Sequence, residues 1–415
     1  MMKTLLSLLC IATWTWAGTP ESKFSSTPFV YELRNVAAPD SSKSRLLVSI
    51  AFLYDDLSFV KGDSGYAASY EFTIAVTNGQ GDWVANREGR DEILVHKYAD
   101  TNSRRKYNLR TYEFDLLPGK YHTTFSFTDR MSKATSHVNA DKELRPFAAD
   151  RTPLELSDMI FLDHATPDSL NRLDITPDLY NSTTTPEQGL HLYMEMFSSD
   201  MAEPLLVQQK IRDWQGKAVL EQQRAWPRRA QLERLVLPIW TEMLPFGIYD
   251  VEMKVQQGKV IKTAQDRFHV TWNGIPQNDV HLNQALSAAL YLANKDERRK
   301  VEMALESAEV GYKREALLAF WERRDDSWET SENEAMNTYY LRVELANAKF
   351  SGRRLEGWKT DLGKVFVTFG APDLIEVLKD NVQTASTQVW HYRSLARRFF
   401  FVDSYGNGDY RLVRH

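Results

Sequence analysis

The chain has 415 residues, of which 43% are hydrophobic and 26% are charged, and this composition excludes a disordered protein and a membrane protein with many spanning helices. The net charge of −5 gives no general attraction to nucleic acid. The single cysteine excludes a disulfide-rich scaffold and any zinc or iron–sulfur site built from cysteines.

Residues 1–17 have the layout of a secretory signal peptide. Lys3 supplies a positive charge, residues 4–16 form an apolar run, and small residues precede a cleavage site after Ala17. The run is shorter than the roughly 20 apolar residues that a membrane-spanning helix needs, and the alternative is a buried N-terminal helix. Cys10 follows a leucine, where a lipid-anchor motif has a small residue. We therefore expect an exported mature chain without cysteine and without a transmembrane helix.

Residues 27–147 follow the two-residue period of β-strands. Residues 46–52 are rich in β-forming side chains, and apolar and polar residues alternate in 70–76 and 121–127. Turn-forming Asn, Gly and Pro residues separate these runs. Short strands at this spacing predict an antiparallel β-sandwich of the immunoglobulin-like class.

Residues 188–274 repeat this arrangement, with alternating runs at 190–196 and 249–255. In both segments an Asp-Trp pair precedes a Leu-Pro…Gly-x-Tyr sequence at a similar distance along the chain. This pattern predicts two tandem copies of one sandwich, and a coincidence of common turn residues is the alternative. The intervening residues 148–187 are rich in Pro, Thr, Asp and Ser, and they predict a linker that contributes an edge strand.

Residues 278–350 change to the 3.6-residue period of an α-helix, which predicts a helical segment. The expected helices cover residues 279–293, 296–308, 312–324 and 331–350. Ser331 and Glu334 have the spacing of a capping box at the start of the last helix, and Gly352 is expected to end it.

Residues 351–415 predict a small α+β domain. Residues 357–364 are expected to form a turn, and residues 365–369 a strand that ends sharply at Gly370 and Pro372. Further strands are expected around residues 389–392, 399–403 and 410–412. We expect these strands to form a curled antiparallel sheet that packs on the last predicted helix.

The string Gly-Trp-Lys-Thr-Asp at residues 357–361 resembles the GWxTD-domain family of exported bacterial proteins, which has no settled activity. The resemblance extends over about 100 residues, from the Phe-Trp pair at 320–321 to the end of the chain. Departures from the family pattern are Leu362 in place of Arg, Phe366 in place of Tyr and Asp326 in place of Pro. The family's usual order, a signal peptide and β domains before this module, agrees with the rest of the chain.

Candidate functional residues concentrate in this module. The candidate binding residues are Trp358, Thr360, Asp361, Gly370, Pro372, Trp390 and Tyr392. Weak candidates for acid–base catalysis are Glu322, Asp325 and Asp361, since paired carboxylates with different pKa values can perform hydrolysis. Ion pairing with the neighbouring arginines is the simpler explanation for the first two. The nine histidines are dispersed, so the sequence predicts no metal site and no cofactor.

The sequence therefore predicts a non-enzymatic, exported cell-envelope protein that acts as an interaction or assembly scaffold, with the C-terminal module as its recognition head. We expect another cell-envelope protein as the partner, peripheral contact with the outer membrane, and no nucleic-acid partner. The expected location is the periplasm, the cell envelope or the medium outside the cell. The alternatives are a carboxylate-dependent hydrolase of envelope polymer or peptide, and a glycan-binding module.

Overall fold

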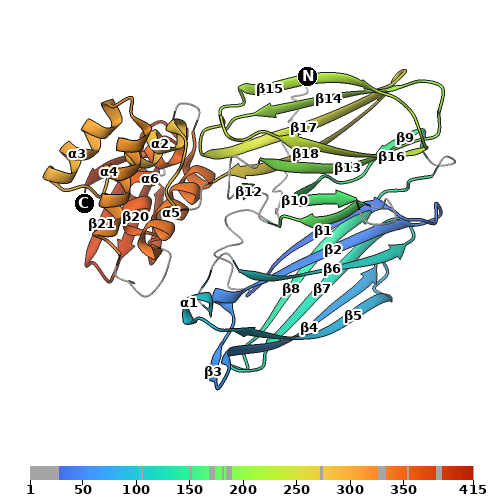
Figure 1. The fold of residues 1–415 in the computed structure, drawn as a ribbon, viewed down its shortest axis with the longest axis horizontal. Coiled ribbons are helices and arrows are strands. Elements are labelled where there is room, and N and C mark those ends of the chain that lie inside the picture. The colour runs from blue at the N-terminus through green and yellow to red at the C-terminus, as the bar shows by residue number, and fades with distance from the viewer. Residues whose placement is uncertain are drawn as a thin grey trace, which may run out of the picture.

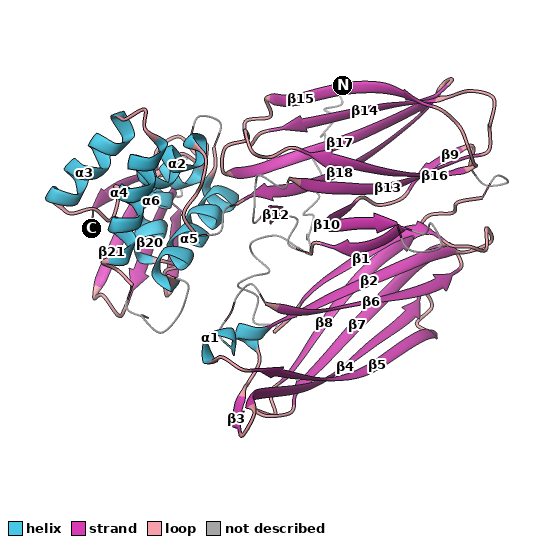
Figure 2. Ribbon diagram, viewed as in Figure 1, coloured by secondary structure: helices cyan, strands magenta, loops and turns pink. Residues whose placement is uncertain are grey.

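The computed structural model describes residues 28–101, 103, 106–148, 152–167, 173–179, 182–183, 189–271, 274–325, 333–352, 355–379 and 386–414. The predicted signal peptide at residues 1–17 lies outside them. The described chain contains two β-rich domains and a mixed C-terminal domain, and Figure 2 shows the longer helices gathered in the latter. No described helix has both the length and the apolar character needed to cross a membrane. The β-rich, multi-domain prediction is confirmed.

The first β-domain has two sheets that share one hydrophobic core. One sheet has the order β1-β2-β6, and the other runs β5-β4-β7-β8 with β3 also paired to β4. Phe52 from the first sheet packs against Tyr70 and Phe127 from the second. The elements are β1 (Val30–Ala37), β2 (Ser44–Leu53), η2 (Tyr54–Asp56), β3 (Val60–Gly62), β4 (Gly65–Asn78), β5 (Trp83–Val95), α1 (Tyr98–Thr101), β6 (Tyr107–Leu116), β7 (Gly119–Asp129) and β8 (Thr135–Leu144).

The second β-domain also has two sheets around one core. Its sheets have the orders β11-β10-β13-β16, with β9 also paired to β13, and β12-β18-β17-β14-β15. The elements are β9 (Leu154–Leu156), β10 (Ile160–Pro167), β11 (Leu173–Pro177), β12 (Ser182–Thr183), β13 (Leu190–Ser198), β14 (Leu205–Arg212), β15 (Ala218–Trp226), β16 (Leu232–Ile239), β17 (Gly247–Gln257) and β18 (Val260–Val270). The segment 148–187, which the sequence suggested as a linker, supplies β9 to β12, and β10 lies inside its sheet.

The two β-domains share a strand order. The run β5-β4-β7-β8 in the first corresponds to β15-β14-β17-β18 in the second, and β1-β2-β6 corresponds to β10-β13-β16. The Leu-Pro…Gly-x-Tyr sequences enter β7 and β17, where the hydroxyls of Tyr121 and Tyr249 each donate to the carbonyl of the residue four positions earlier, at 2.7 Å. The repeated sequence landmark thus has one structural role in both domains.

A network of charged side chains joins the two β-domains. Arg34 on β1 pairs with Asp266 on β18 at 2.7 Å, and it also contacts Glu32. Asp158 of the second domain accepts the backbone N–H of Asn35 at 2.8 Å and pairs with Arg145 at 2.8 Å. Burial raises the pKa of Asp266 to about 6, even though Arg34 lowers it.

Apolar residues complete this interface. They come from β1 and β2 on one side and from β10 and β13 on the other, and Figure 1 shows these strands facing each other. The buried members are Val36, Leu47, Ile160, Leu162 and Tyr193. The two β-domains therefore form one joined body.

The described part of the C-terminal domain packs five helices, a short helical segment and a four-stranded antiparallel sheet around one core (Figure 1). The order of its sheet is β19-β20-β21-β22. The elements are α2 (Asp279–Ala289), α3 (Lys295–Glu306), α4 (Val310–Glu322), α5 (Glu334–Phe350), η3 (Gly357–Lys359), α6 (Asp361–Phe369), β19 (Leu374–Lys379), β20 (Ser386–Tyr392), β21 (Arg397–Asp403) and β22 (Arg411–Arg414).

The structure corrects two details of this domain. Residues 365–369, expected as a strand, belong to helix α6, because Thr360 caps its N-terminus and Gly370 ends it with φ of 84°. The N-cap of α5 is Asn333, whose side chain accepts the Met336 N–H, and Ser331 lies outside the described residues. The predicted sheet and its position against α5 are as expected, with Phe350 packing on Trp390.

Hydrogen bonds attach this domain to the loop before β17. Gln284 on α2 accepts the Phe246 N–H at 2.6 Å and donates to the carbonyl oxygen of the same residue at 3.2 Å. His281 bonds to the carbonyl of Leu244 at 2.7 Å, and Phe246 itself enters the C-terminal core. Helix α2 therefore connects the C-terminal domain to the second β-domain, and α5 adds a contact between Glu344 and His269 on β18 at 3.3 Å.

Candidate functional site

Two glycines of the Gly-Trp-Lys-Thr-Asp-Leu-Gly string allow three stretches of backbone to stack. A Cβ atom on Gly357 would lie 1.9 Å from the carbonyl oxygen of Ala346 on α5. A Cβ atom on Gly363 would lie 1.9 Å from the carbonyl oxygen of Gly357. Real Cβ atoms do not approach backbone this closely, so α5, η3 and α6 can pack in this way only with glycine at both positions.

The other members of the string hold this stack together. Trp358 is buried, packs against Tyr291 with ring centroids 5.6 Å apart, and donates its indole N–H to Glu356 at 2.9 Å. The Thr360 hydroxyl donates to the Gly357 carbonyl at 2.6 Å and accepts the Gly363 N–H at 3.0 Å. Asp361 accepts the N–H of Leu412 on β22 at 3.1 Å. These contacts connect α5, α6 and the last strand.

Thr360→Ala should destabilise the protein by about 1 kcal/mol, the usual cost of losing an N-cap side chain. Thr360→Ser keeps the capping oxygen and should stay close to wild type. Urea unfolding followed by circular dichroism measures both variants. Equal stability of the alanine and serine variants would contradict the capping role.

The remaining predicted binding residues also make internal contacts. Trp390 and Tyr392 on β20 are both buried. The Tyr392 hydroxyl donates to the carbonyl of Gly370 at 2.7 Å, which fixes the sharp chain turn after α6. Pro372 follows that turn and is half-buried. The large exposed tryptophans of the described chain are Trp83 and Trp240, at 73% each, in the β-domains.

Two of the candidate catalytic carboxylates, Glu322 and Asp325, are neighbours at the end of α4, and the third, Asp361, lies on α6. Glu322 is exposed at the end of α4, and Asp325 follows it after a turn. Asp361 begins α6, accepts the N–H of Leu412, and forms an ion pair with Lys364 at 3.3 Å. Among the described residues, no group of three or more His, Cys, Asp or Glu side chains is placed to hold a metal ion.

A groove of about 360 Å³ lies on the C-terminal domain, beside α5. Its lining comes from the turn after α2, the end of α4 and the turn after it, the first half of α5 and the end of α6. The lining residues are Leu292, Trp321, Arg324, Glu334, Ala335, Thr338, Tyr339, Arg342 and Thr368. This volume falls in the range of roughly 300–1,000 Å³ that small-molecule pockets occupy.

Two arginines of the groove have different surroundings. Arg324 forms a two-pronged ion pair with Glu297, at 3.0 and 2.7 Å, and this contact lowers the pKa of that carboxyl. Arg342 is half-buried, and among the described residues it has no hydrogen-bond or ion-pair partner. Burial lowers the pKa of the Arg342 guanidinium. The groove therefore contains one cation that the described protein does not neutralise.

The sequence prediction did not include Arg342, although two predicted binding residues lie beside it. A Cβ atom on Gly370 would be 3.2 Å from the Arg342 guanidinium carbon, and Tyr392 donates to the Gly370 carbonyl. The available signal was position: Arg342 follows Tyr339 by three residues on α5, so both project from the same side of the helix. Tyr339 is buried and lines the groove.

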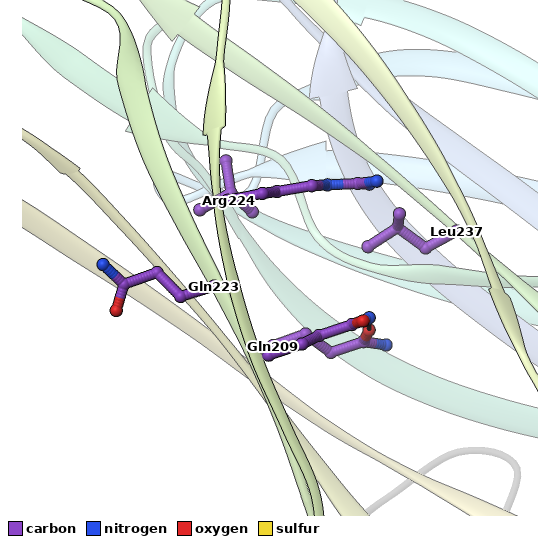
Figure 3. Close-up of a pocket in the computed structure, with 6 residues that line it drawn as sticks. Gln209, Gln223, Arg224 and Leu237 are labelled. Atoms are coloured by element: carbon purple, nitrogen blue, oxygen red, sulfur yellow. Dashed lines mark hydrogen bonds between the residues drawn. The ribbon is translucent and has the colours of Figure 1, made fainter.

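A second cavity, between strands of the second β-domain, is much smaller. Its volume is about 40 Å³, and Figure 3 shows Gln209, Gln223, Arg224 and Leu237 around it. A cavity of this size accommodates one or two water molecules and excludes a larger ligand. The groove beside α5 is therefore the better candidate for a binding site.

A sequence model of the GWxTD domain family matches residues 247–415. The chain contains a GWxTD domain. The match begins with β17, so the region shared with the family includes the last two strands of the second β-domain as well as the complete C-terminal domain. The suspected family is confirmed by this match. No protein with a curated description matches the chain.

Two solved structures show distant similarity to the chain. A trypsin-activated alpha-2-macroglobulin from Escherichia coli has a TM-score of 0.17 at 12% identity and covers 59% of this chain. A β-glucuronidase from Parabacteroides merdae has a TM-score of 0.20 at 9% identity and covers 54%. The chain spans 16% and 27% of the length of these two proteins. TM-scores this low carry no conclusion about function.

Proposed function

We propose that this protein is an exported, non-enzymatic binding protein of the cell envelope, and that its GWxTD domain recognises a partner through the groove beside α5. The observation that carries the proposal is the unneutralised Arg342 in a groove with apolar walls. Pockets of this kind combine apolar lining with a few polar groups that orient the ligand. The two β-domains, as immunoglobulin-like sandwiches, would act as the spacer that presents the GWxTD domain.

The positions of the candidate carboxylates relative to the groove support binding over hydrolysis. Glycoside hydrolysis needs two carboxyl groups that face one substrate bond, within roughly 5–10 Å of each other. Here Asp361 accepts the N–H of Leu412 on β22, and neither Glu322 nor Asp325 lines the groove. A binding role therefore requires only the groove, whereas hydrolysis would also require two carboxyl groups that face the substrate there.

Photo-crosslinking in intact cells tests the proposal. A benzophenone amino acid at Ala335, an exposed residue of the groove, should give a discrete crosslinked partner. The same probe at Lys300, an exposed residue of α3 outside the groove, should not. Identical products from both positions, or no product from Ala335 in a folded protein, would contradict recognition through this groove.

N-terminal sequencing tests export. Protein purified from the envelope fraction should begin after Ala17, because the small residues before it form the cleavage site. A chain that is found in the cytoplasm and still begins at Met1 or Met2 would contradict this part of the proposal.

A further inference from the structure

Arg342 is half-buried, and no carboxylate or carbonyl of the described residues pairs with its guanidinium. The guanidinium therefore depends for its hydration on solvent in the groove, and burial removes part of that solvent. Arg324, which lines the same groove, has such a partner, since Glu297 accepts hydrogen bonds from both terminal nitrogens of its guanidinium. An anionic group of a ligand would give Arg342 the counter-ion that Glu297 gives Arg324.

The neighbouring phenol groups do not supply that anion. The Tyr339 hydroxyl donates to the carbonyl of Ala288 at 2.5 Å, and the Tyr392 hydroxyl donates to the carbonyl of Gly370 at 2.7 Å. Burial raises the pKa of both tyrosines, so both are neutral at physiological pH. The two phenols next to Arg342 are therefore neutral and do not act as its counter-ion.

The charge balance of the groove favours a singly charged ligand. Arg324 is neutralised by Glu297, so Arg342 is the cation of the described groove lining that remains for a ligand. A phosphate with two negative charges would meet a single unpaired arginine. A carboxylate carries one charge and matches the planar guanidinium with two parallel hydrogen bonds.

The walls of the groove specify the rest of the ligand. Leu292, the Trp321 ring and the Tyr339 ring offer apolar surface next to Arg342. A volume of about 360 Å³ accommodates a compact group and excludes a long folded segment. The ligand should therefore carry its carboxylate at one end of an apolar body.

We propose that the groove binds the C-terminal carboxylate of a partner polypeptide whose last residue is apolar, with Arg342 as the counter-ion. This inference rests on the proposed binding function and names the part of the partner that is recognised. A peptide terminus has the required chemistry, a carboxylate next to one apolar side chain, and the groove needs to enclose only that last residue.

Isothermal titration of the full mature chain tests this inference. The probes are acetylated tetrapeptides that end in Leu, Val or Phe, each as the free acid and as the C-terminal amide. The free acid should bind saturably and at least about tenfold more tightly than the amide, as expected for a charge-assisted pair. Equal affinity of acid and amide, or no binding of any peptide, would overturn the inference.

Variants of Arg342 separate binding from folding. Arg342→Met should lose tenfold or more in affinity for the free acid and keep or raise the melting temperature, because no partner is lost. Arg342→Lys should bind with intermediate affinity. Arg314→Met, at an exposed arginine of α4, is the matched control and should bind like wild type. Unchanged affinity in Arg342→Met would overturn the inference, and if that variant fails to fold, Arg342→Lys and the acid–amide comparison decide.

Titration with decanoate distinguishes a fatty acid from a peptide C-terminus as the source of the apolar carboxylate. Binding of decanoate without binding of any peptide would overturn the peptide terminus as the ligand. A crosslinked partner at Ala335 together with no peptide binding would leave the proposed function standing and remove only this inference. Failure of both experiments would remove the proposed function as well.

Discussion

Gly357→Ala should prevent the GWxTD domain from reaching its native packing, with a loss of about 4 kcal/mol or more in the free energy of unfolding. The new Cβ would lie 1.9 Å from the carbonyl oxygen of Ala346, 2.6 Å from its carbonyl carbon and 2.8 Å from the Cα of Asn347. All three atoms belong to the backbone of α5, so no rotation of a flexible side chain relieves the contact. The helix itself would have to move.

Near-UV circular dichroism and thermal unfolding measure this effect. The near-UV signal should fall, because Trp358 and Trp321 lose their fixed surroundings in the core. Gly363→Ala should behave similarly, since its Cβ would lie 1.9 Å from the carbonyl oxygen of Gly357. Gly352→Ala is the matched control, because nothing lies within 4 Å of its Cβ position. A Gly357→Ala protein with the melting temperature of Gly352→Ala would contradict the stacking argument.

The stacking also explains why the string that names the family contains these residue types. Glycine permits the contact with α5, tryptophan fills the adjacent core, threonine caps α6, and aspartate accepts the N–H of the last strand. In this chain each member of the string is used to assemble the domain. The binding surface proposed here lies beside the string, at Arg342, and depends on the fold that the string holds.

Several features of the fold could be predicted because they rest on local patterns. The alternation in the β-domains, the Leu-Pro…Gly-x-Tyr landmark and the 3.6-residue period before α5 each involve residues that are close in sequence. Helix α6 was predicted wrongly because Val365, Val367 and Thr368 favour strands by composition. The apolar spacing of Leu362, Val365 and Phe366 was helical, and together with the Thr360 cap it outweighed that preference.

Arg342 and the network between the β-domains could not be predicted in this way. An arginine in a helix usually faces solvent, and only the packing of Tyr339 and Gly370 around Arg342 shows that this one is half-buried in a groove. Arg34, Asp158 and Asp266 are separated by more than a hundred residues, and no local pattern connects them. Such contacts depend on how complete domains meet.

Asp158→Asn should destabilise the joined β-domains by about 3 kcal/mol, the lower end of the range for breaking a buried ion pair. The side chain of Asp158 is 13% exposed and contacts Lys142, Arg145 and the N–H of Asn35. The Arg145 side chain is 38% exposed, so water can hydrate it when the ion pair with Asp158 is lost. This hydration lowers the free-energy cost of the substitution. The wild-type domains should unfold in one transition, and that transition should broaden or divide in the variant, since this contact joins them.

The same variant should change how stability depends on pH. Burial by itself raises the pKa of Asp158, but Lys142, Arg145 and Arg34 outweigh it and lower the pKa to about 2. The ionised carboxylate therefore contributes stability that is fully present above about pH 4 and is lost as the pH falls through 2. Urea midpoints between pH 5 and pH 2 should fall more steeply for wild type than for Asp158→Asn. Asp63→Asn, at an exposed turn, removes a charge without touching the interface and should follow wild type. Parallel curves for all three proteins would show that Asp158 does not hold the two domains together.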